Sequence, residues 1–276
     1  MPLVCVIMPA YRAVPTLRMA ALSVMRQTWK DWELVIVNDA SGDGTGELAE
    51  RLAAEEGRIR VLHQPRNLGA AAAMNRAWRG SSSPLVAVLD ADDAAFPSRL
   101  SQQVEHLARN AEVSVLGSAA HFVDLSGVFL RTVTLPRDHK TLARRRWAAS
   151  PFIHPTVMMR RGFLDGIGGY QDGLRLGEDY DLWMRGFLHG GFVYENLAEP
   201  LVIYRTRAVQ RWEMIKASAR VRLRAGRREG RAGRALLAAA RVLTEGALEQ
   251  TGVFAWRHSR RSQGGKPPDL SAMESE

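Results

Sequence analysis

The amino-acid sequence predicts an α/β fold in which a mostly parallel central sheet is flanked by helices. Over the first 110 residues, short apolar runs alternate with amphipathic stretches, which is typical of a parallel sheet covered by helices. Polar or glycine-containing turns follow each apolar run, as expected where a strand ends. The predicted strands are 4–8, 33–37, 59–62 and 85–89, and the predicted helices are 15–28, 46–55, 69–79 and 97–109.

The pattern is less regular from residue 113 onward, which predicts a mixed second half. The strands expected there are 113–117, 121–124, 128–134, 156–160 and 200–204, with a helix at 179–189. Beyond residue 205 the composition changes to arginine, alanine and glycine, with helices expected at 208–229 and 232–250. We therefore expect a main domain over 1–205 with halves 1–110 and 111–205, a helical basic appendage over 206–258 and a disordered tail over 259–276.

The charge of the chain is unevenly distributed. A formal net charge of +9 first suggests a nucleic-acid-binding protein. Residues 1–204 contain equal numbers of basic and acidic residues, so residues 205–276 carry the whole excess. A nucleic acid is therefore not the favoured partner of the main domain.

The sequence also predicts where the protein works. Neither the charged and apolar regions of a signal peptide nor an uncharged run of eighteen apolar residues is present. The single cysteine, Cys5, cannot form an internal disulfide, which fits a reducing compartment. We expect a cytoplasmic protein whose contact with a membrane, at the inner face, is peripheral.

Three carboxylates follow the fourth predicted strand in the segment Asp90-Ala91-Asp92-Asp93. Ligands of open α/β sheets bind outside the carboxyl ends of the strands, so this segment is well placed for a site. Adjacent carboxylates repel each other, and a hard divalent ion such as Mg²⁺ or Mn²⁺ would relieve that repulsion. The alternative is a solvated acidic turn that caps the following helix.

The other strand ends also carry polar side chains. Asp39 ends the second strand and could accept hydrogen bonds from a base or a ribose, although the following Ser, Asp, Gly and Thr residues would equally suit a turn and a helix cap. Tyr11 offers a face for stacking and Arg12 a cation for phosphate. Gly69 opens a helix whose amides could meet an anion. Together these ends predict a nucleotide pocket that includes Pro9, Ala10, Tyr11, Arg12, Asp39, Asn67, Gly69, Asp90, Ala91 and Asp92.

A second group of candidates begins the helix predicted at 179–189. Glu178 and Asp179 stand where acids usually stabilise a helix N-terminus. The nearby Trp183 favours a further role, because an acid beside aromatic side chains is partly desolvated, and desolvation raises the pKa toward that of a useful general base. His154 is a candidate metal ligand, with a structural histidine as the alternative.

The order of these segments resembles glycosyltransferase family 2 of the GT-A fold, a Rossmann-like architecture, over residues 3 to about 205. The segments that carry the resemblance are Pro9-x-Tyr11, Asn38-Asp39-x-Ser41-x-Asp43-Gly44-Thr45, Asn67-x-Gly69 with Asn75, Asp90-Ala91-Asp92-Asp93, His154-Pro155-Thr156, Gly168-Gly169-Tyr170 and Glu178-Asp179 with Leu182-Trp183-x-Arg185. In two places the chain departs from the family pattern: Arg12 replaces a common asparagine, and Arg207 replaces a common histidine.

The resemblance implies a metal-dependent, inverting transfer of a sugar from a nucleotide-diphosphate donor to an acceptor hydroxyl. It implies that Pro9, Tyr11, Asp39 and Asp90 line the nucleoside pocket, that Asp92 holds Mn²⁺ or Mg²⁺, and that Asp179 is the catalytic base. The half 1–110 would bind the nucleotide sugar and the half 111–205 the acceptor. Glu178 and Trp183 join the expected sugar-nucleotide site, and Arg12 or Arg205 could stabilise the leaving diphosphate.

A hexosyl- or N-acetylhexosaminyltransferase of envelope polysaccharide or glycoconjugate synthesis is expected, with a UDP-sugar as the favoured donor and a glycan or lipid-linked acceptor. The rival enzyme is a nucleotidyltransferase, but the turn after the first strand lacks the glycine-rich basic loop of that class. The rival from another class is a basic nucleic-acid-binding protein.

The composition of the basic appendage predicts an anionic binding partner for that segment. If its helix is continuous, five arginines fall on one face, which would suit an anionic membrane surface or a lipid-diphosphate acceptor. Three glycines oppose this, because each destabilises a helix interior by about 1 kcal/mol. The arginines are Arg220, Arg224, Arg227, Arg231 and Arg234, and the glycines are Gly226, Gly230 and Gly233.

Overall fold

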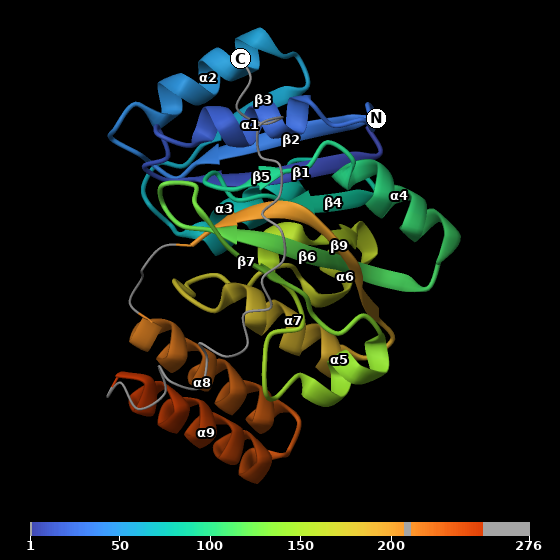
Figure 1. Ribbon diagram of the computed structural model, residues 1–276, viewed down its shortest axis with the longest axis vertical. Coiled ribbons are helices and arrows are strands. Elements are labelled where there is room, and N and C mark those ends of the chain that lie inside the picture. The colour runs from blue at the N-terminus through green and yellow to red at the C-terminus, as the bar shows by residue number, and fades with distance from the viewer. Residues whose placement is uncertain (1, 207–210, 251–276) are drawn as a thin grey trace.

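The computed structural model describes residues 2–206 and 211–250 and confirms the α/β architecture (Figure 1). Its strands form one sheet in the order β3-β2-β1-β4-β8-β6-β9-β5, and β7 pairs with β6. The strands are β1 (Val4–Ala10), β2 (Trp32–Asn38), β3 (Ile59–His63), β4 (Leu85–Val88), β5 (Ala94–Ala95), β6 (Val113–Val123), β7 (Phe129–Val133), β8 (Met158–Arg160) and β9 (Val193–Arg205).

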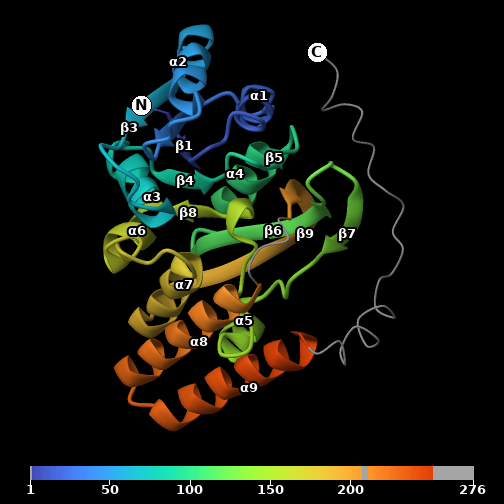
Figure 2. The same cartoon turned by 90° about the vertical axis from the view of Figure 1, so that its left-hand side faces the viewer.

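Helices cover both faces of this sheet (Figure 2). They are α1 (Leu17–Met25), α2 (Thr45–Glu55), α3 (Ala70–Arg79), α4 (Arg99–Arg109), α5 (His139–Arg145), α6 (Arg161–Ile167), α7 (Glu178–His189), α8 (Arg211–Arg228) and α9 (Ala232–Gln250), with a 3₁₀ turn at His154–Thr156. Alternate residues of β1 face opposite sides: Val6 packs in the cluster that contains α1, α2 and α4, and Ile7 packs with α3, α6 and α7. Both faces of the sheet are therefore buried.

The first half of the sheet is parallel and the second half is mixed. β1 pairs in parallel with β2 and β4, and β2 with β3. β8 then runs antiparallel to both β4 and β6, whereas β6 and β9 are parallel. The parallel half brings the carboxyl ends of β1, β2 and β4 to one edge, where the candidate residues begin.

The strands predicted at 113–117 and 121–124 are wrong as separate elements, because β6 is continuous. Gly117 and Ser118, at the end of the first predicted strand and in the gap after it, lie inside β6. A Cβ on Gly117 would come within 2.3 Å of Asn196 Oδ1, so the glycine serves close packing. The strand predicted at 200–204 is the last part of the longer β9. β5, α5 and α6 were not predicted from the sequence.

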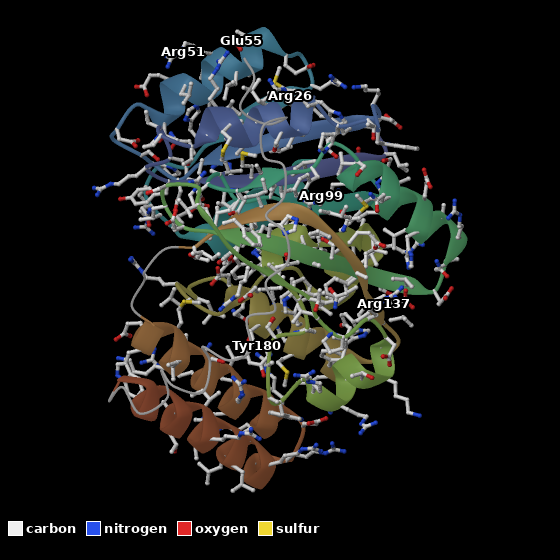
Figure 3. The ribbon with its side chains drawn as sticks, viewed as in Figure 1. Arg26, Arg51, Glu55, Arg99, Arg137 and Tyr180 are labelled. Carbon is white, nitrogen blue, oxygen red and sulfur yellow. The ribbon has the colours of Figure 1, made fainter. Side chains whose placement is uncertain are left out.

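The basic appendage is packed against the main domain. Arg222 on α8 is buried and donates to the carbonyls of Trp147 (2.8 Å) and Ala148 (2.9 Å). Its guanidinium also lies over the ring of Tyr180, 4.7 Å from the centroid. Tyr180 belongs to α7 and is labelled in Figure 3. Val221 shares a hydrophobic cluster with these aromatic residues. The described helix α8 is therefore packed on the main domain through a buried arginine and apolar side chains.

The five-arginine stripe is wrong as a single helix face. α8 ends at Arg228 and α9 starts at Ala232, with Gly230 between them in the left-handed region (φ 68°). Arg220, Arg224 and Arg227 thus belong to α8 and Arg234 to α9. The part of the predicted appendage beyond 250, the tail at 259–276 and Arg207 lie outside the described residues. Among the described helices, none combines the length and the apolar character needed to cross a membrane.

Candidate active site

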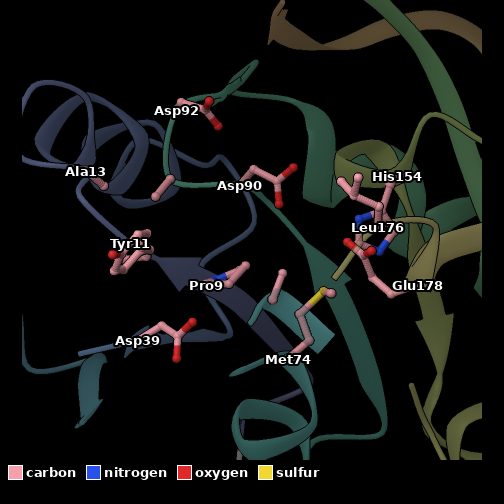
Figure 4. A pocket seen from close by; sticks show the side chains of 13 residues that line it. Pro9, Tyr11, Ala13, Asp39, Met74, Asp90, Asp92, His154, Leu176 and Glu178 are labelled. Carbon is pink, nitrogen blue, oxygen red and sulfur yellow. The ribbon is translucent and has the colours of Figure 1, made fainter. Parts of the chain in front are cut away.

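The carboxyl ends of β1, β2 and β4 border a cavity of about 360 Å³, here called the first cavity. Figure 4 shows Asp39 and Tyr11 on one side of it, His154 and Glu178 on the opposite side, and Asp90 between them. The residues that line it are Pro9, Ala10, Tyr11, Ala13, Asp39, Ala70, Met74, Asp90, Ala91, Asp92, His154, Leu176 and Glu178. Most of the side chains predicted from the strand ends are thus brought together.

Asp39 is held in a fixed position at the end of β2. It is only 3% exposed, and its Oδ1 accepts hydrogen bonds from Gln64 Nε2 (2.7 Å) and from the amide of Leu68 (2.8 Å). Its Oδ2 accepts from the amide of Gly69 (2.8 Å). These contacts orient the carboxylate before any ligand arrives, at the edge of the first cavity.

These bonds correct the expectation for the segment that opens α3. We expected the amides near Gly69 to meet a ligand anion, but the anion that they bind is the Asp39 carboxylate. Asn67 donates to the Asp39 carbonyl (3.4 Å), and neither Asn67 nor Gly69 lines the first cavity. Both residues support the pocket through Asp39.

The turn after β4 gathers three carboxylates. Ligand atoms of Asp90, Asp92 and Asp93 lie within 4.8 Å of one another. Asp93 is buried, its Oδ1 accepts from the Arg205 amide (2.8 Å), and its Oδ2 has no hydrogen-bond partner among the described residues. Burial and the negative charges of Asp90 and Asp92 raise the pKa of Asp93 well above its ordinary value. Such a cluster of oxygen donors with an unsatisfied buried oxygen fits a hard divalent cation.

Arg205 fixes this turn from the end of β9. Its Nε donates to the carbonyl of Asp92 (3.3 Å), and its Nη1 donates to the carbonyl of Leu125 (2.8 Å). We expected Arg205 to stabilise a leaving diphosphate, but these bonds engage its guanidinium with backbone carbonyls. Its role here is to hold the carboxylate turn.

The acids at the start of α7 have different surroundings. Asp181 is buried and paired with Arg185 at 2.6 Å, so it serves the helix. Glu178 lines the first cavity, and its Oε2 is buried without a partner among the described residues. Burial, with the negative charges of Asp179 and Asp90, raises the pKa of Glu178 to about 7. Glu178 therefore changes its charge near neutral pH.

A second cavity, of about 410 Å³, adjoins the first. The two share Asp90, His154, Leu176 and Glu178 in their walls. Of these two cavities, Asp179 lines only the second. Tyr204 and two residues of α8, Met214 and Ser218, also line the second cavity. The pair of acids at the start of α7 thus stands where the two cavities meet.

Two predicted site residues, Trp183 and Arg12, do not line either cavity. Trp183 is fully buried among core aromatic rings, including Phe152, because it belongs to the inward face of α7. Arg12 does not line the first cavity, and its guanidinium lies over the ring of Tyr11, 5.4 Å from the centroid. His154 does line both cavities, but its Nε2 is hydrogen-bonded to the Tyr170 hydroxyl (2.9 Å), and it is not part of the carboxylate cluster.

Sequence reasoning missed residues that position the site. Gln64 follows β3 directly, so its place at a strand end was an available signal. Asn75 on α3, which the resemblance named without a role, accepts from the Tyr170 amide (2.9 Å) and donates to the Tyr170 carbonyl (2.8 Å). Gly169 lets these groups approach, because it adopts φ 75° and a Cβ there would lie 2.6 Å from Asn75 Oδ1. Nothing in the local pattern indicated that Met214 or Ser218 would reach the second cavity.

A parallel half-sheet with carboxylates at its strand ends, a mixed second half and two adjoining cavities define an enzyme of the GT-A type. The model of the family "Glycosyl transferase family 2" matches residues 5–168. The chain therefore belongs to glycosyltransferase family 2, and it is a glycosyltransferase.

Individual comparisons agree with this assignment. The chain is similar to the putative glycosyltransferase EpsE of Bacillus subtilis, with 34% identity over 72% of each chain. It is similar to the succinoglycan biosynthesis protein ExoU of Rhizobium meliloti, with 35% identity over 68% of this chain and 57% of ExoU. The structure of S. aureus TarS 1–349 in complex with UDP-GlcNAc superposes with a TM-score of 0.68 and 17% identity, over 98% of this chain and 78% of that one. The chain spans 39% of a longer TarS structure.

The raised pKa of Glu178 predicts a pH-dependent stability in metal-free buffer. Folding lifts this pKa from 4.5 to about 7, so the stabilisation from Glu178 is complete below pH 4.5 and is lost as the pH rises through 7. Relative to wild type, Glu178→Gln should gain about 3 kcal/mol of unfolding free energy between pH 4.5 and pH 8. Urea unfolding at both pH values, with chelator present, measures this difference. The exposed control Glu105→Gln should show a constant difference, and a constant difference for Glu178→Gln would contradict the assignment.

Proposed function

We propose that the enzyme catalyses a metal-dependent, inverting transfer of a sugar from a nucleotide-diphosphate donor to an acceptor hydroxyl. The observation that carries the proposal is the junction of the two cavities at Asp90 and Glu178. The first cavity has the aromatic ring and the fixed carboxylate that suit a nucleoside, in Tyr11 and Asp39. The second cavity supplies a separate space for the acceptor, with an acid at its wall.

The donor proposed is a UDP-sugar that carries a hexose or an N-acetylhexosamine. Asp39 would accept hydrogen bonds from the nucleoside, while Pro9, Tyr11 and Asp90 enclose it. TarS, named with UDP-GlcNAc, supports this choice through its similar fold. Similarity to a succinoglycan biosynthesis protein supports a place in polysaccharide or glycoconjugate synthesis, with a glycan or lipid-linked acceptor. Family membership favours this reading over the nucleotidyltransferase and nucleic-acid-binding alternatives.

Mn²⁺ or Mg²⁺ is the proposed cofactor. Asp92, with Asp90 and Asp93 beside it, would hold the ion at the edge of the first cavity. When bound, the ion neutralises charge on the leaving diphosphate. The chain itself contributes the fixed geometry of this turn, through the bonds from Arg205 to Asp93 and to the Asp92 carbonyl.

Asp179 is the proposed base. It lines the second cavity, where an acceptor hydroxyl would lie, whereas Glu178 stands between the cavities. The acceptor oxygen forms a bond to the anomeric carbon as the bond from that carbon to the diphosphate oxygen breaks, and the acceptor proton goes to Asp179. A single displacement of this kind inverts the anomeric centre and needs no covalent sugar–enzyme intermediate.

Removal of the proposed metal ligand tests the cofactor. Asp92→Ala should abolish transfer and metal-dependent UDP binding, because few protein groups hold the ion. The donor is first found by screening UDP- and GDP-sugars for nucleotide release with Mn²⁺ and Mg²⁺, and binding is then measured by calorimetry with and without chelator. Asp165→Ala, at an exposed aspartate outside both cavities, is the control and should behave as wild type. Full wild-type activity in chelator would refute the proposal.

Removal of the proposed base separates chemistry from binding. Asp179→Asn should lower kcat by at least about 10²-fold, the lower end of the usual contribution of a positioned base. UDP affinity should stay nearly unchanged, since Asp179 does not line the first cavity. Steady-state kinetics and UDP titration check both quantities. Normal turnover with a weakened UDP affinity would remove Asp179 from this role.

Peripheral association with an anionic membrane at the cytoplasmic face is proposed for α9. Leu236 and Leu237 are 61% and 75% exposed, and the exposed arginines Arg234 and Arg241 lie on either side of them along the helix. Apolar side chains flanked by cations suit an anionic lipid surface. Flotation with vesicles of phosphatidylglycerol should recover the wild-type chain at low salt but not Leu236→Ser/Leu237→Ser. Equal flotation of both proteins, or of neither, would contradict this placement.

A further inference from the structure

A third cavity, of about 470 Å³, lies between α8 and the loop that precedes α7. Arg175 comes from the loop, and Arg220 and Arg224 come from successive turns of α8. Among the described residues of its wall, Glu213 is the only acid, and it is already paired with Lys216. We call it the arginine-lined cavity, and its wall carries a net positive charge.

The three arginines have no role in holding the fold. All three are exposed, and none of them has a hydrogen bond or ion pair with another described residue. Arg222 on the same helix shows the contrast, because it is buried and donates to two backbone carbonyls. Grouping three unpaired cations around one cavity is electrostatically unfavourable without an anion, so the arrangement points to a ligand.

The position of the cavity identifies the substrate that would carry this anion. Leu176 lines the first, the second and the arginine-lined cavity. α8 gives Met214 and Ser218 to the second cavity and Arg220 and Arg224 to the arginine-lined one. Asp92, the proposed partner of the donor diphosphate, lines only the first cavity. An anion at the arginines therefore adjoins the acceptor space and is separate from the donor diphosphate.

We propose that Arg175, Arg220 and Arg224 bind a diphosphate group on the acceptor. The inference rests on the proposed function, whose acceptor it specifies. Guanidinium groups are permanently charged and bind phosphate oxygens in a bidentate manner. One arginine suffices for a carboxylate, whereas three match the higher charge and the larger number of oxygens of a diphosphate. The acceptor is thus a diphosphate-linked molecule that extends its hydroxyl into the second cavity beside Asp179.

Calorimetric titration with geranyl diphosphate, in chelator so that the donor site lacks its metal, tests the proposal. Geranyl diphosphate should bind to wild type, and geraniol should not. Arg220→Ser/Arg224→Ser should bind geranyl diphosphate about 10- to 100-fold more weakly, as expected for the loss of two charge-assisted contacts. The matched control is Arg227→Ser/Arg228→Ser, which removes the same charge from exposed positions outside the cavity and should bind as wild type.

Several results would overturn the inference. An equal loss of affinity for geranyl diphosphate in both double variants would indicate nonspecific electrostatic attraction by the basic helix α8, and not a site at the three arginines. Binding of inorganic pyrophosphate as tightly as geranyl diphosphate would indicate a site for free diphosphate and not for an acceptor. Binding of UDP with Mn²⁺ to Arg220→Ser/Arg224→Ser should remain normal. Failure of wild type to bind UDP with Mn²⁺ would refute the proposed function and is read separately from the geranyl diphosphate result.

Discussion

The turn from Asp90 to Asp93 depends on one contact made across 112 residues of chain, the hydrogen bond from the Arg205 amide to the Asp93 carboxyl. Three carboxylates in one turn repel each other, so the turn needs support from outside. The bond from the Arg205 amide to Asp93 supplies it, together with the bond from Arg205 Nε to the Asp92 carbonyl. Because Arg205 ends β9, the mixed second half of the sheet fixes the site that the parallel first half opens.

The same gathering of acids explains the electrostatic state of the site. Asp90 raises the pKa of both Asp93 and Glu178, although the two belong to different elements of the fold. Holding these negative charges close together lowers the stability of the folded protein. Such a loss of stability is common where a site must bind a cation. A divalent ion and a diphosphate together would restore the balance of charge. Without a ligand, the negative charges around the first cavity are therefore not balanced, which suits the cavity to a ligand that brings a cation.

The sequence predicted those features of the fold that depend on local pattern. The four strands of the parallel half and their polar ends follow from apolar periodicity, so Asp39 and Asp90 could be placed at the same edge of the sheet. Features that depend on tertiary packing could not be predicted from the sequence. Trp183 looked available to a ligand, but its place on the inward face of α7 depends on rings far along the chain. The amide of Gly69 was expected to bind an external anion, yet Asp39 supplies one. Neither partner is visible in local sequence.

A crystal structure of the chain with Mn²⁺ and UDP, in which the ion is located by its anomalous scattering, would test whether the turn from Asp90 to Asp93 holds the metal of the donor site. We expect an anomalous peak at Asp92, with the diphosphate beside it and the uridine against Tyr11 and Asp39. Bound UDP in that cavity with the peak elsewhere, or uridine outside the cavity, would contradict the account.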